Sequence, residues 1–581
     1  MATPSPNAAF YFSGHNYRTA GDGVVGRQSA SGGFLRGFIH HGGIERLQIY
    51  ADSLEAVDEF QAFVGDTGGD PENIGINLPM TTGNLSHIGT LFRPGPDIGS
   101  LAWRRRYFDQ AGFSICGITH TIYETMALNV LGNILTAPVQ PWDALVCTSK
   151  CVKGVIERLL DGWCEYLNAR FGGTATIPCQ LPIIPLGVDS QTYAARGGDS
   201  EARADLRSRM GIADGDIALL YAGRLDHVEK ANPVPMYLAA ETTQKASSRK
   251  IHLIQAGQAS TPEMETAFKE AATAFAPSIT HHFIDGAMTE LYDKVWAAGD
   301  IFISLSDNIQ ESFGLTPIEA MATGLPAVVS DYDGYRESVR DGIDGFCIPT
   351  TAPPPGAGAE LGFLYHTGYA PYSAFTGAAS QSTAVDIAAC AEKLGLLIGN
   401  EDLRRKFGEA GQQRAAEIYD WRHVVAAHQA LWSELAEMRN SEAERIALPT
   451  GAQPYPMAPD PFALFTDHPS SLIAGDAVVS ANAGSTVFLR QFRSSELSTP
   501  LAAVLMDEAA TLALLEKLST NGTYAVSSLS GDLAPEKLAP FYLTLGWLAK
   551  MGLISVSPAK TTGGADIPFG VSETWKTLTG G

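Results

Sequence analysis

The chain has 581 residues, more than one hydrophobic core usually supports, so we expect about three domains that each bury a core. Its 63 acidic and 40 basic residues leave a formal net charge of −23, which disfavours nonspecific binding to nucleic acid or to an anionic membrane. Seven cysteines, an odd number spread through the chain, indicate reduced thiols, and their spacing indicates no metal site.

The start of the chain shows no signal-peptide pattern, because no basic residue precedes Arg18 and the apolar stretches there are short. No later run reaches the roughly 18 apolar residues that a transmembrane helix needs. We therefore predict a soluble, cytoplasmic protein without an integral membrane segment.

Short apolar segments alternate with helix-like or loop segments through the first part of the chain. The predicted strands are residues 8–14, 46–52, 73–79, 113–120, 144–149 and 181–187. Such alternation is typical of a parallel sheet in an α/β protein. We predict a Rossmann-like, doubly wound domain over residues 1–205.

The same alternation then repeats. The predicted strands are residues 217–225, 251–257, 279–286, 300–307, 326–331 and 345–349, and the predicted helices include 233–248, 262–275 and 316–324. A second doubly wound domain over residues 206–446 follows. Ligands of open α/β sheets bind beyond the carboxyl ends of the strands, so two facing sheets predict a cleft for a two-part substrate.

The stretch "ESFGLTPIEAMATGLP" predicts a helix start at a candidate anion site. Thr316 fits an N-cap and Glu319 fits the reciprocal partner of a capping box, so Glu311 lies in the loop before the helix. Backbone N–H groups at such a start attract phosphate. On this stretch alone, the alternative stays open that Glu319 only caps the helix and Glu311 is an ordinary surface acid.

Two cations follow a predicted strand in "YAGRLDHVEK". Arg224 and Lys230 lie beyond the sheet in one loop and would suit a diphosphate, although solvated surface cations are the commoner case. In "SASGGFLRGF", Gly32 and Gly33 stand where a helix is expected to begin, which allows close approach to a ligand or marks an ordinary turn. His120 ends a predicted strand and is a candidate binding or structural residue.

These motifs together resemble the retaining glycosyltransferases of family 4, which have the GT-B fold. The resemblance is carried by "ESFGLTPIEAMATGLPAVVS", which is similar to the family's two-glutamate motif, and by "GRLDHVEK", "GITH", "IPLGVD" and "SGG" in the expected order. It spans roughly residues 8–440, and "YDWRHVVAAHQALWSELAEMR" resembles the long helix with which such enzymes cross back to the first domain.

The resemblance implies a role for each matching residue. Arg224 and Lys230 would bind the diphosphate of a nucleotide-sugar and stabilise it as the leaving group, Glu311 would face the donor sugar, and Glu319 would hold the ribose. His120 would contact the donor sugar. The remaining implied donor-binding residues are Gly32, Gly33, Phe313, Gly314, Leu315 and Thr316. One departure is the loop between Arg224 and Lys230, which is one residue longer than the usual four.

The implied reaction is transfer of a sugar to a hydroxyl-bearing acceptor with retained configuration and without a metal ion or other cofactor. A UDP-sugar is favoured over a GDP- or ADP-sugar on frequency alone, and the acceptor could be a glycan, a lipid-linked or small molecule, or a protein. A catalytically silent GT-B protein that binds sugar nucleotides or protein partners is the alternative. Hydrolysis by the two glutamates is less favoured, because phosphate-binding features surround them.

The composition changes after residue 446. Residues 447–462 contain five prolines and predict a stiff linker, and residues 463–581 predict a small, mainly helical accessory domain that weakly resembles a winged helix. This last segment has ten acidic and seven basic residues, so its net charge of −3 favours acceptor docking over DNA binding. An insertion-like stretch at 350–375 follows a strand near the expected cleft and is a candidate for shaping specificity.

Overall fold

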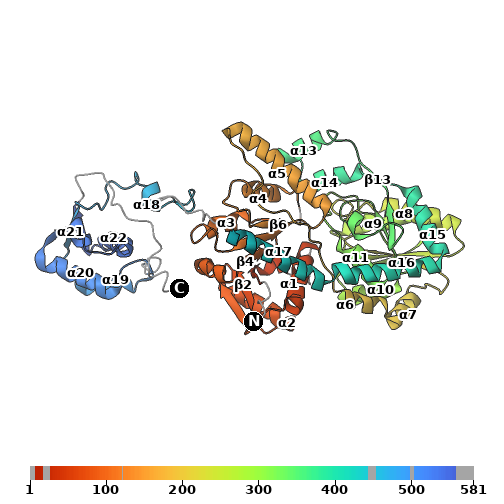
Figure 1. Cartoon of the computed structure of the whole chain (residues 1–581), viewed down its shortest axis with the longest axis horizontal. Coiled ribbons are helices and arrows are strands. Elements are labelled where there is room, and N and C mark those ends of the chain that lie inside the picture. The colour runs from red at the N-terminus through yellow and green to blue at the C-terminus, as the bar shows by residue number, and fades with distance from the viewer. Residues whose placement is uncertain (1–6, 18–25, 121, 442–452, 498–502, 558–581) are drawn as a thin grey trace. The chain divides into compact units, whose positions relative to one another are not determined.

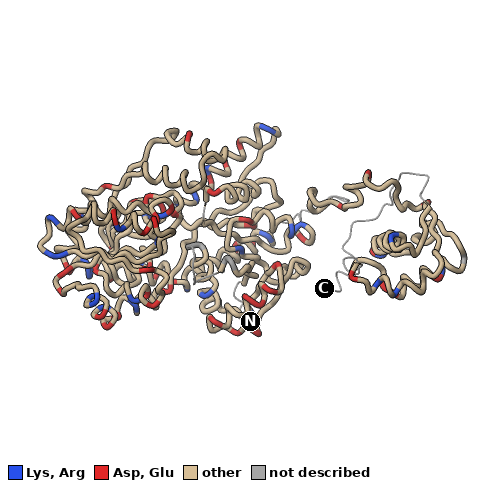
Figure 2. The backbone as a smooth tube through the Cα atoms, turned by 180° about the vertical axis from the view of Figure 1, so that it is seen from behind, with Lys and Arg blue, Asp and Glu red and all other residues tan. Residues whose placement is uncertain are grey.

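The computed structural model describes residues 7–17, 26–120, 122–441, 453–497 and 503–557. The chain divides into two compact units after Arg445 (Figure 1). Lys and Arg are interspersed with Asp and Glu along the backbone (Figure 2). Within the described residues, every helix is too short or too polar to cross a membrane.

The first sheet of the N-terminal unit has six parallel strands in the order β3-β2-β1-β4-β5-β6. Its strands are β1 (Ala9–Phe12), β2 (Leu47–Ala51), β3 (Ile74–Asn77), β4 (Thr90–Arg93), β5 (Ser114–Ile118) and β6 (Ala144–Val146). Its helices are α1 (Gly26–His41), α2 (Leu54–Asp66), α3 (Gly99–Arg105), α4 (Thr125–Ile134) and α5 (Lys150–Phe171). The hydrophobic pattern predicts five of these strands and misses β4.

Residues 181–187, predicted as a strand of this sheet, do not form one. The segment runs beside the end of β6 through an isolated bridge between Cys147 and Ile183. Cys147 N donates to Pro182 O at 2.8 Å, and Ile184 N donates to Cys147 O at 3.1 Å. Pro182 and Pro185 have no N–H to donate, which keeps this apolar run from extending into a ladder.

The second sheet also has six parallel strands, in the order β12-β11-β10-β7-β8-β9. They are β7 (Ile217–Ala222), β8 (Ile251–Gly257), β9 (Thr280–Asp285), β10 (Ile301–Ser304), β11 (Ala327–Ser330) and β12 (Gly345–Ile348). The helices around them are α8 (Val234–Ala246), α9 (Pro262–Phe275), α10 (Thr289–Ala298), α11 (Leu315–Thr323), α12 (Tyr335–Ser338), α15 (Ile387–Gly399) and α16 (Glu401–Arg414). All six predicted strands are present, so the chain has the two Rossmann-like, doubly wound domains that the sequence predicts.

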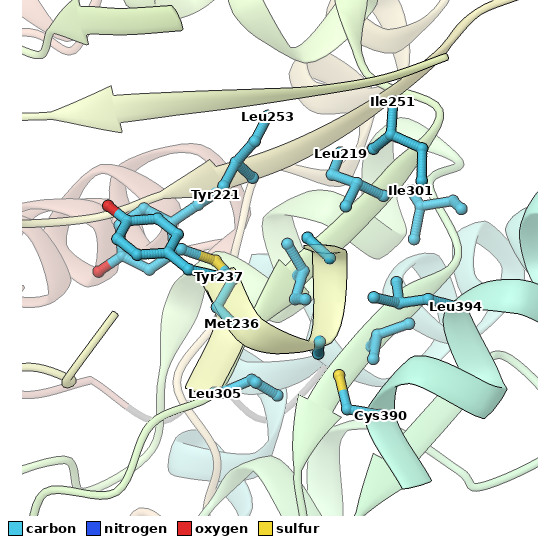
Figure 3. Close-up of a cluster of buried hydrophobic side chains, with 14 of the residues drawn as sticks. Leu219, Tyr221, Met236, Tyr237, Ile251, Leu253, Ile301, Leu305, Cys390 and Leu394 are labelled. Atoms are coloured by element: carbon cyan, nitrogen blue, oxygen red, sulfur yellow. The ribbon is translucent and has the colours of Figure 1, made fainter. Parts of the chain in front are cut away.

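One apolar face of the second sheet is filled by branched and aromatic side chains from β7, β8, β10, α8 and α15 (Figure 3). Leu219, Leu253 and Ile301 come from neighbouring parallel strands and are fully buried against helix residues such as Tyr237 and Leu394. Strands that are buried on both faces read as continuous apolar runs, which is why the sequence indicates this sheet clearly.

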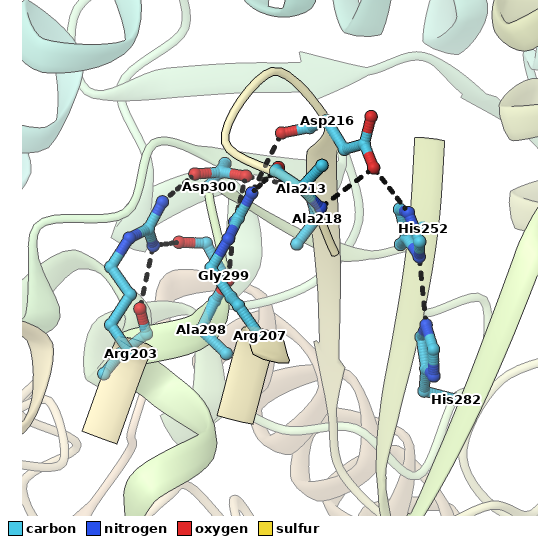
Figure 4. A network of polar contacts seen from close by, with 11 residues as sticks. Arg203, Arg207, Ala213, Asp216, Ala218, His252, His282, Ala298, Gly299 and Asp300 are labelled. Carbon is cyan, nitrogen blue, oxygen red and sulfur yellow. Dashed lines mark hydrogen bonds and ion pairs between the residues drawn. The ribbon is translucent and has the colours of Figure 1, made fainter. Parts of the chain in front are cut away.

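The second domain begins earlier than residue 205. Helices α6 (Ser190–Gly197) and α7 (Ser200–Arg209) pack on α11 and α10 of the second domain. Arg203 Nη2 and Arg207 Nη1 bind the two carboxylate oxygens of Asp300 at 2.6 and 2.9 Å, and Asp300 also accepts a bond from Ala218 N (Figure 4). These contacts hold α7 against the sheet, which composition alone does not indicate.

Helix α17 (Trp421–Ser441) is the last described helix of the N-terminal unit and packs on α1 in the first domain, as the resemblance implies (Figure 1). Trp421 and Trp432 join the same apolar cluster as Phe10 and Phe38. The chain thus passes between the domains twice, and the two passages lie side by side: Val188 N donates to Tyr419 O at 2.8 Å, and Trp421 N donates to Val188 O at 3.2 Å.

The predicted insertion folds as β13 (Thr350–Thr351), α13 (Ala359–His366), α14 (Tyr372–Gln381) and β14 (Ala384–Val385). The C-terminal unit contains α18 (Pro461–Leu464), α19 (Ser485–Arg493), α20 (Glu508–Asn521), α21 (Val526–Ser530) and α22 (Pro535–Lys550). It also has an antiparallel sheet in the order β16-β15-β17, with β15 (Val478–Ala481), β16 (Thr523–Ala525) and β17 (Ile554–Ser557). Its own apolar cluster includes Leu515, Leu545 and Trp547.

Candidate active site

The loop after β7 carries the two predicted cations and is fixed by its own hydrogen bonds. Asp226 Oδ1 accepts bonds from Val228 N and Glu229 N at 2.9 Å each, and Lys230 N donates to Asp226 O at 3.1 Å. Asn308 Nδ2 donates to Val228 O at 2.6 Å from the loop after β10. The loop is therefore a compact turn held at the carboxyl ends of two adjacent strands.

Lys230 and Glu311 form an ion pair across the ends of the second sheet. Lys230 Nζ contacts Glu311 Oε2, and the two side chains are only 19% and 10% exposed. Burial alone lowers the pKa of Lys230, but the Glu311 carboxylate outweighs it and holds the pKa above its ordinary value. The loop between Arg224 and Lys230 is one residue longer than the family's usual four, yet it still brings Lys230 to Glu311. We call the loop between β10 and α11, which contains Glu311, the glutamate loop.

Arg224 lies beside this pair and is more open. Its Nη1 contacts Glu229 Oε2 at 3.3 Å, and about a third of each side chain is exposed. The nearby Arg224 charge also lowers the pKa of Lys230, although the attraction of the Glu311 carboxylate prevails. The Lys230 ammonium and the partly exposed Arg224 guanidinium thus lie near the start of α11, where an anion would find several donors.

The predicted capping box at Thr316 and Glu319 does not form. Helix α11 begins at Leu315, with Gly314 as its N-cap at φ 80°, and no side chain caps it. A Cβ at Gly314 would stand 2.0 Å from Tyr335 Cε1, so both the positive φ and the packing require glycine. Phe313 is buried in the core, while Leu315 and Thr316 are partly exposed in the first turn.

Glu319 is held by a partner far away in the sequence. Tyr193 Oη of α6 donates to Glu319 Oε1 at 2.8 Å. Burial raises the pKa of the Glu319 carboxyl, while the Tyr193 bond and the nearby Arg196 oppose that shift. The carboxylate is thus directed toward α6 instead of reaching back to the helix start, which leaves the ribose role as a prediction and removes the capping alternative.

The first domain contacts the glutamate loop through the end of β6. Thr148 Oγ1 and Ser149 Oγ both approach Ser312 O, at 3.4 and 3.2 Å. Lys150 N, in the first turn of α5, donates to Glu337 Oε1 at 2.6 Å. Sequence reasoning missed these residues, although their position directly after a buried strand is the signal that could have found them.

His120 lies two residues beyond β5 in a pocket of the first domain. The pocket is also lined by Ser31, Pro94, Trp421 and His428. Ser31 precedes the two predicted glycines, so the pattern does bring the "SGG" segment near His120.

The prediction that Gly32 and Gly33 open a helix is wrong. Helix α1 begins at Gly26, so both glycines lie within it. A Cβ at Gly33 would stand 2.7 Å from Trp421 Cζ2, which shows that this glycine allows α1 and α17 to approach closely. The sequence signal for small residues is explained by this helix packing.

The insertion of the second domain reaches the first domain through aromatic side chains. Tyr123 stacks on Phe375 with ring centroids 5.1 Å apart, and Phe375 stacks on Tyr365 at 5.2 Å. Thr125 N donates to Tyr365 Oη at 2.8 Å. The loop that follows His120 therefore meets the insertion beside the predicted site. Gly377 of α14 packs on Val228, which lies in the loop between Arg224 and Lys230.

Comparison with known proteins gives partial matches. D-inositol 3-phosphate glycosyltransferase of Nocardia farcinica is 30% identical over 171 residues, which are 29% of this chain and 36% of that protein. The protein of the same name from Geodermatophilus obscurus is 26% identical over 174 residues, 29% of this chain and 37% of that protein. The chain thus spans little more than a third of the length of these relatives.

Among solved structures, HepE of Anabaena in complex with UDP covers 74% of this chain and 100% of its own, with 13% identity and a TM-score of 0.47. Residues 202–354 match the family model described as Glycosyl transferases group 1. This range contains Arg224, Lys230, Glu311 and Glu319. The second domain is therefore the part of the chain that matches the glycosyltransferase group 1 family.

Proposed function

We propose that this protein is a retaining glycosyltransferase that moves a sugar from a nucleotide-diphosphate sugar to a hydroxyl-bearing acceptor. The observation that carries the proposal is the Lys230–Glu311 ion pair at the carboxyl ends of the second sheet, inside the matched range. A lysine, a partly exposed arginine and an uncapped helix start converge there, which suits a diphosphate.

The roles of the side chains follow from their charges. A bound diphosphate would take over Lys230 and Arg224 from their glutamate partners, because two phosphate groups carry more charge than one carboxylate. Glu311, released from the lysine, would then accept hydrogen bonds from the sugar next to the diphosphate. The positive end of α11 would add to the field at the leaving oxygen.

In the reaction we propose, the bond between the anomeric carbon and the β-phosphate oxygen breaks, and its electron pair stays on the phosphate. The acceptor oxygen forms the new bond on the same face of the sugar. The proton of the acceptor hydroxyl passes to the departing phosphate. Lys230 and Arg224 stabilise the growing negative charge without moving a proton, so no metal ion enters the proposal.

Donor binding and turnover test this proposal directly. We would measure thermal stabilisation and diphosphate release with UDP-, GDP- and ADP-sugars, UDP-sugars being the first choice, with and without EDTA. Stabilisation by one base and slow release of its diphosphate, unchanged by EDTA, is the expected result. An Arg224→Ala variant should lose release, whereas Arg405→Ala, at a 65% exposed side chain, is the matched control. If no UDP-, GDP- or ADP-sugar binds, the proposal fails, and the silent alternative remains only in the form that binds protein partners.

A further inference from the structure

The loop after β11 contains a strained residue that the proposed reaction does not yet use. Asp333 has φ 44°, and it is the one residue other than glycine with positive φ in the described part of the chain. Side chains of L residues are disfavoured in this region, although Asp and Asn tolerate it better than most. A strained residue beside a candidate site is a reason to look for a function there.

Packing explains why the backbone stays in this conformation. Gly334 follows Asp333, and a Cβ at that position would stand 2.6 Å from both the Cα and the O of Phe313. The loop after β11 therefore packs directly against the backbone of the glutamate loop. Packing does not explain the side chain, however, because glycine at position 333 would adopt the same φ without strain.

The Asp333 carboxyl group lies where the two domains meet. Its Oδ1 accepts a bond from Ser149 Oγ at 3.4 Å, and its backbone O accepts one from Cys151 Sγ at 3.7 Å. Both partners belong to the first domain. Ser149 Oγ also contacts Ser312 O, so one serine connects Asp333 to the residue that follows Glu311.

Burial and the nearby carboxylates favour the neutral form of the Asp333 carboxyl group, which suits an uncharged ligand. Burial, and then the Glu311 carboxylate, raise the pKa of Asp333 to about 8, while the bond from Ser149 opposes the shift. A carboxyl group in this state can both donate and accept hydrogen bonds, as a sugar hydroxyl does. The other acidic neighbour is Glu337, whose carboxylate is occupied by Lys150 N.

We propose that Asp333 is a further donor-specificity residue, which binds hydroxyl groups of the transferred sugar together with Glu311. This inference rests on the proposed function, since it places the sugar next to the diphosphate at Lys230. It names the sugar subsite as the region between the loop after β11, the glutamate loop and Ser149. The ligand class is a sugar with free hydroxyl groups at the positions that face these two carboxyl groups.

Binding to the full-length protein separates this inference from the proposed function. Calorimetry would compare free UDP, GDP and ADP with UDP-glucose, GDP-mannose and ADP-glucose, and the ratio of the two Kd values for one base measures what the sugar contributes. Asp333→Ala should lower that contribution about tenfold, as expected for lost hydrogen bonds to the sugar, while the Kd for the free diphosphate stays within about twofold.

Two further variants make the test sharp. Asp333→Gly should lose the same sugar contribution and yet raise Tm, because glycine relieves the positive φ. Asp331→Asn is the control, since Asp331 is 41% exposed and pairs with Arg336. An unchanged ratio in both Asp333 variants, or an equal loss for the free diphosphate, overturns the inference. If the parent protein binds no diphosphate of any base, the proposed function fails and this inference fails with it.

Discussion

Two ion pairs, one in each domain, show how differently the same chemistry can be used. Arg105 and Asp143 form a bidentate pair at 2.6 and 2.7 Å with both side chains fully buried. Asp143 also accepts bonds from the backbone N–H groups of Ile115 and Gln140, both at 2.8 Å. Lys230 and Glu311 instead lie at a strand end where some of each side chain reaches solvent.

The two ion pairs differ in whether their carboxylate oxygens already have a full set of hydrogen-bond partners. Every carboxylate oxygen of Asp143 has two partners, so nothing is left for a ligand and the pair holds β5, β6 and α3 together. The Lys230–Glu311 pair can exchange partners, because a phosphate could replace the carboxylate at the lysine. We infer that a closed pair stabilises the fold, whereas an open pair prepares a site.

The largest effect is expected where the closed pair is broken. Asp143→Ala leaves a buried guanidinium and two backbone N–H groups without their acceptor, so the free energy of unfolding should fall by about 3–5 kcal/mol. Urea unfolding measures it. Asp402→Ala, at an 89% exposed side chain, should change the unfolding free energy by less than about 0.5 kcal/mol. A similar loss in both variants would contradict the special weight given to Asp143.

The open pair should show the opposite balance. Lys230→Ala should slow the proposed sugar transfer by about 10²- to 10³-fold, as expected when a donor to the leaving group is removed. Its loss of unfolding free energy should be smaller than that of Asp143→Ala, because water can reach the Glu311 carboxylate that remains. Rates and urea unfolding on the same preparations make the comparison. A large stability loss with unchanged rate would reverse the assignment of the two pairs.

A smaller effect is expected from pH, in the polar network at the edge of the second sheet (Figure 4). His252 Nδ1 and His282 Nε2 lie 3.0 Å apart, and His252 Nε2 lies 3.2 Å from Asp216 Oδ2. Burial and the neighbouring His252 lower the pKa of His282 to about 4, and burial also lowers that of His252. Between about pH 4 and pH 6.5, the unfolded chain therefore binds more protons at these histidines than the folded chain does.

Stability should accordingly fall as the pH drops from about 6.5 toward 4. In His282→Gln, the decrease in Tm between about pH 7.5 and pH 5 should be smaller than in the parent by about 2–4 °C, the shift that about 1 kcal/mol gives in a domain of this size. His366→Gln, at an exposed position of α13, should follow the parent. Parallel curves for all three proteins would mean that these histidines do not carry the acid response.

The smallest effect is expected at the contact between the insertion and the first domain. Tyr365→Phe keeps the ring against Phe375 and removes only the hydroxyl that accepts the Thr125 N bond. The loss should be about 1 kcal/mol in unfolding free energy. Tyr369→Phe, at an 83% exposed ring, is the matched control. Equal behaviour of the two variants would show that the aromatic contact, and not this bond, joins the domains.

Local patterns in the sequence predict the sheets well and the site in part. All six strands of the second sheet are indicated by buried apolar runs, and the Lys230 and Glu311 positions follow from strand ends. The capping box fails because Glu319 bonds with Tyr193, 126 positions away, and no local rule contains that partner. Long-range partners of this kind are visible only once the chain has folded.

The other errors have similar causes. Gly32 and Gly33 look like a helix start or a turn because glycine is common there, but they lie within α1, and at Gly33 the close approach of Trp421 requires a small residue. Residues 181–187 look like a strand because most of their side chains are apolar. The two prolines in this segment lack N–H groups, however, and so prevent a continuous ladder of hydrogen bonds. Asp333 carries no warning in the sequence, since its positive φ results from the packing of Gly334 on Phe313.

The return of α17 to the first domain bears on the order of folding during synthesis. Domains usually fold from the N-terminus as they leave the ribosome. Here the first domain lacks Trp421, Trp432 and the rest of its last helix until the whole second domain has been made. Until then the apolar cluster of the first domain stays partly exposed, so the second domain can complete its core before the first domain does. A nascent chain that stops before residue 421 therefore exposes a surface that chaperones would bind.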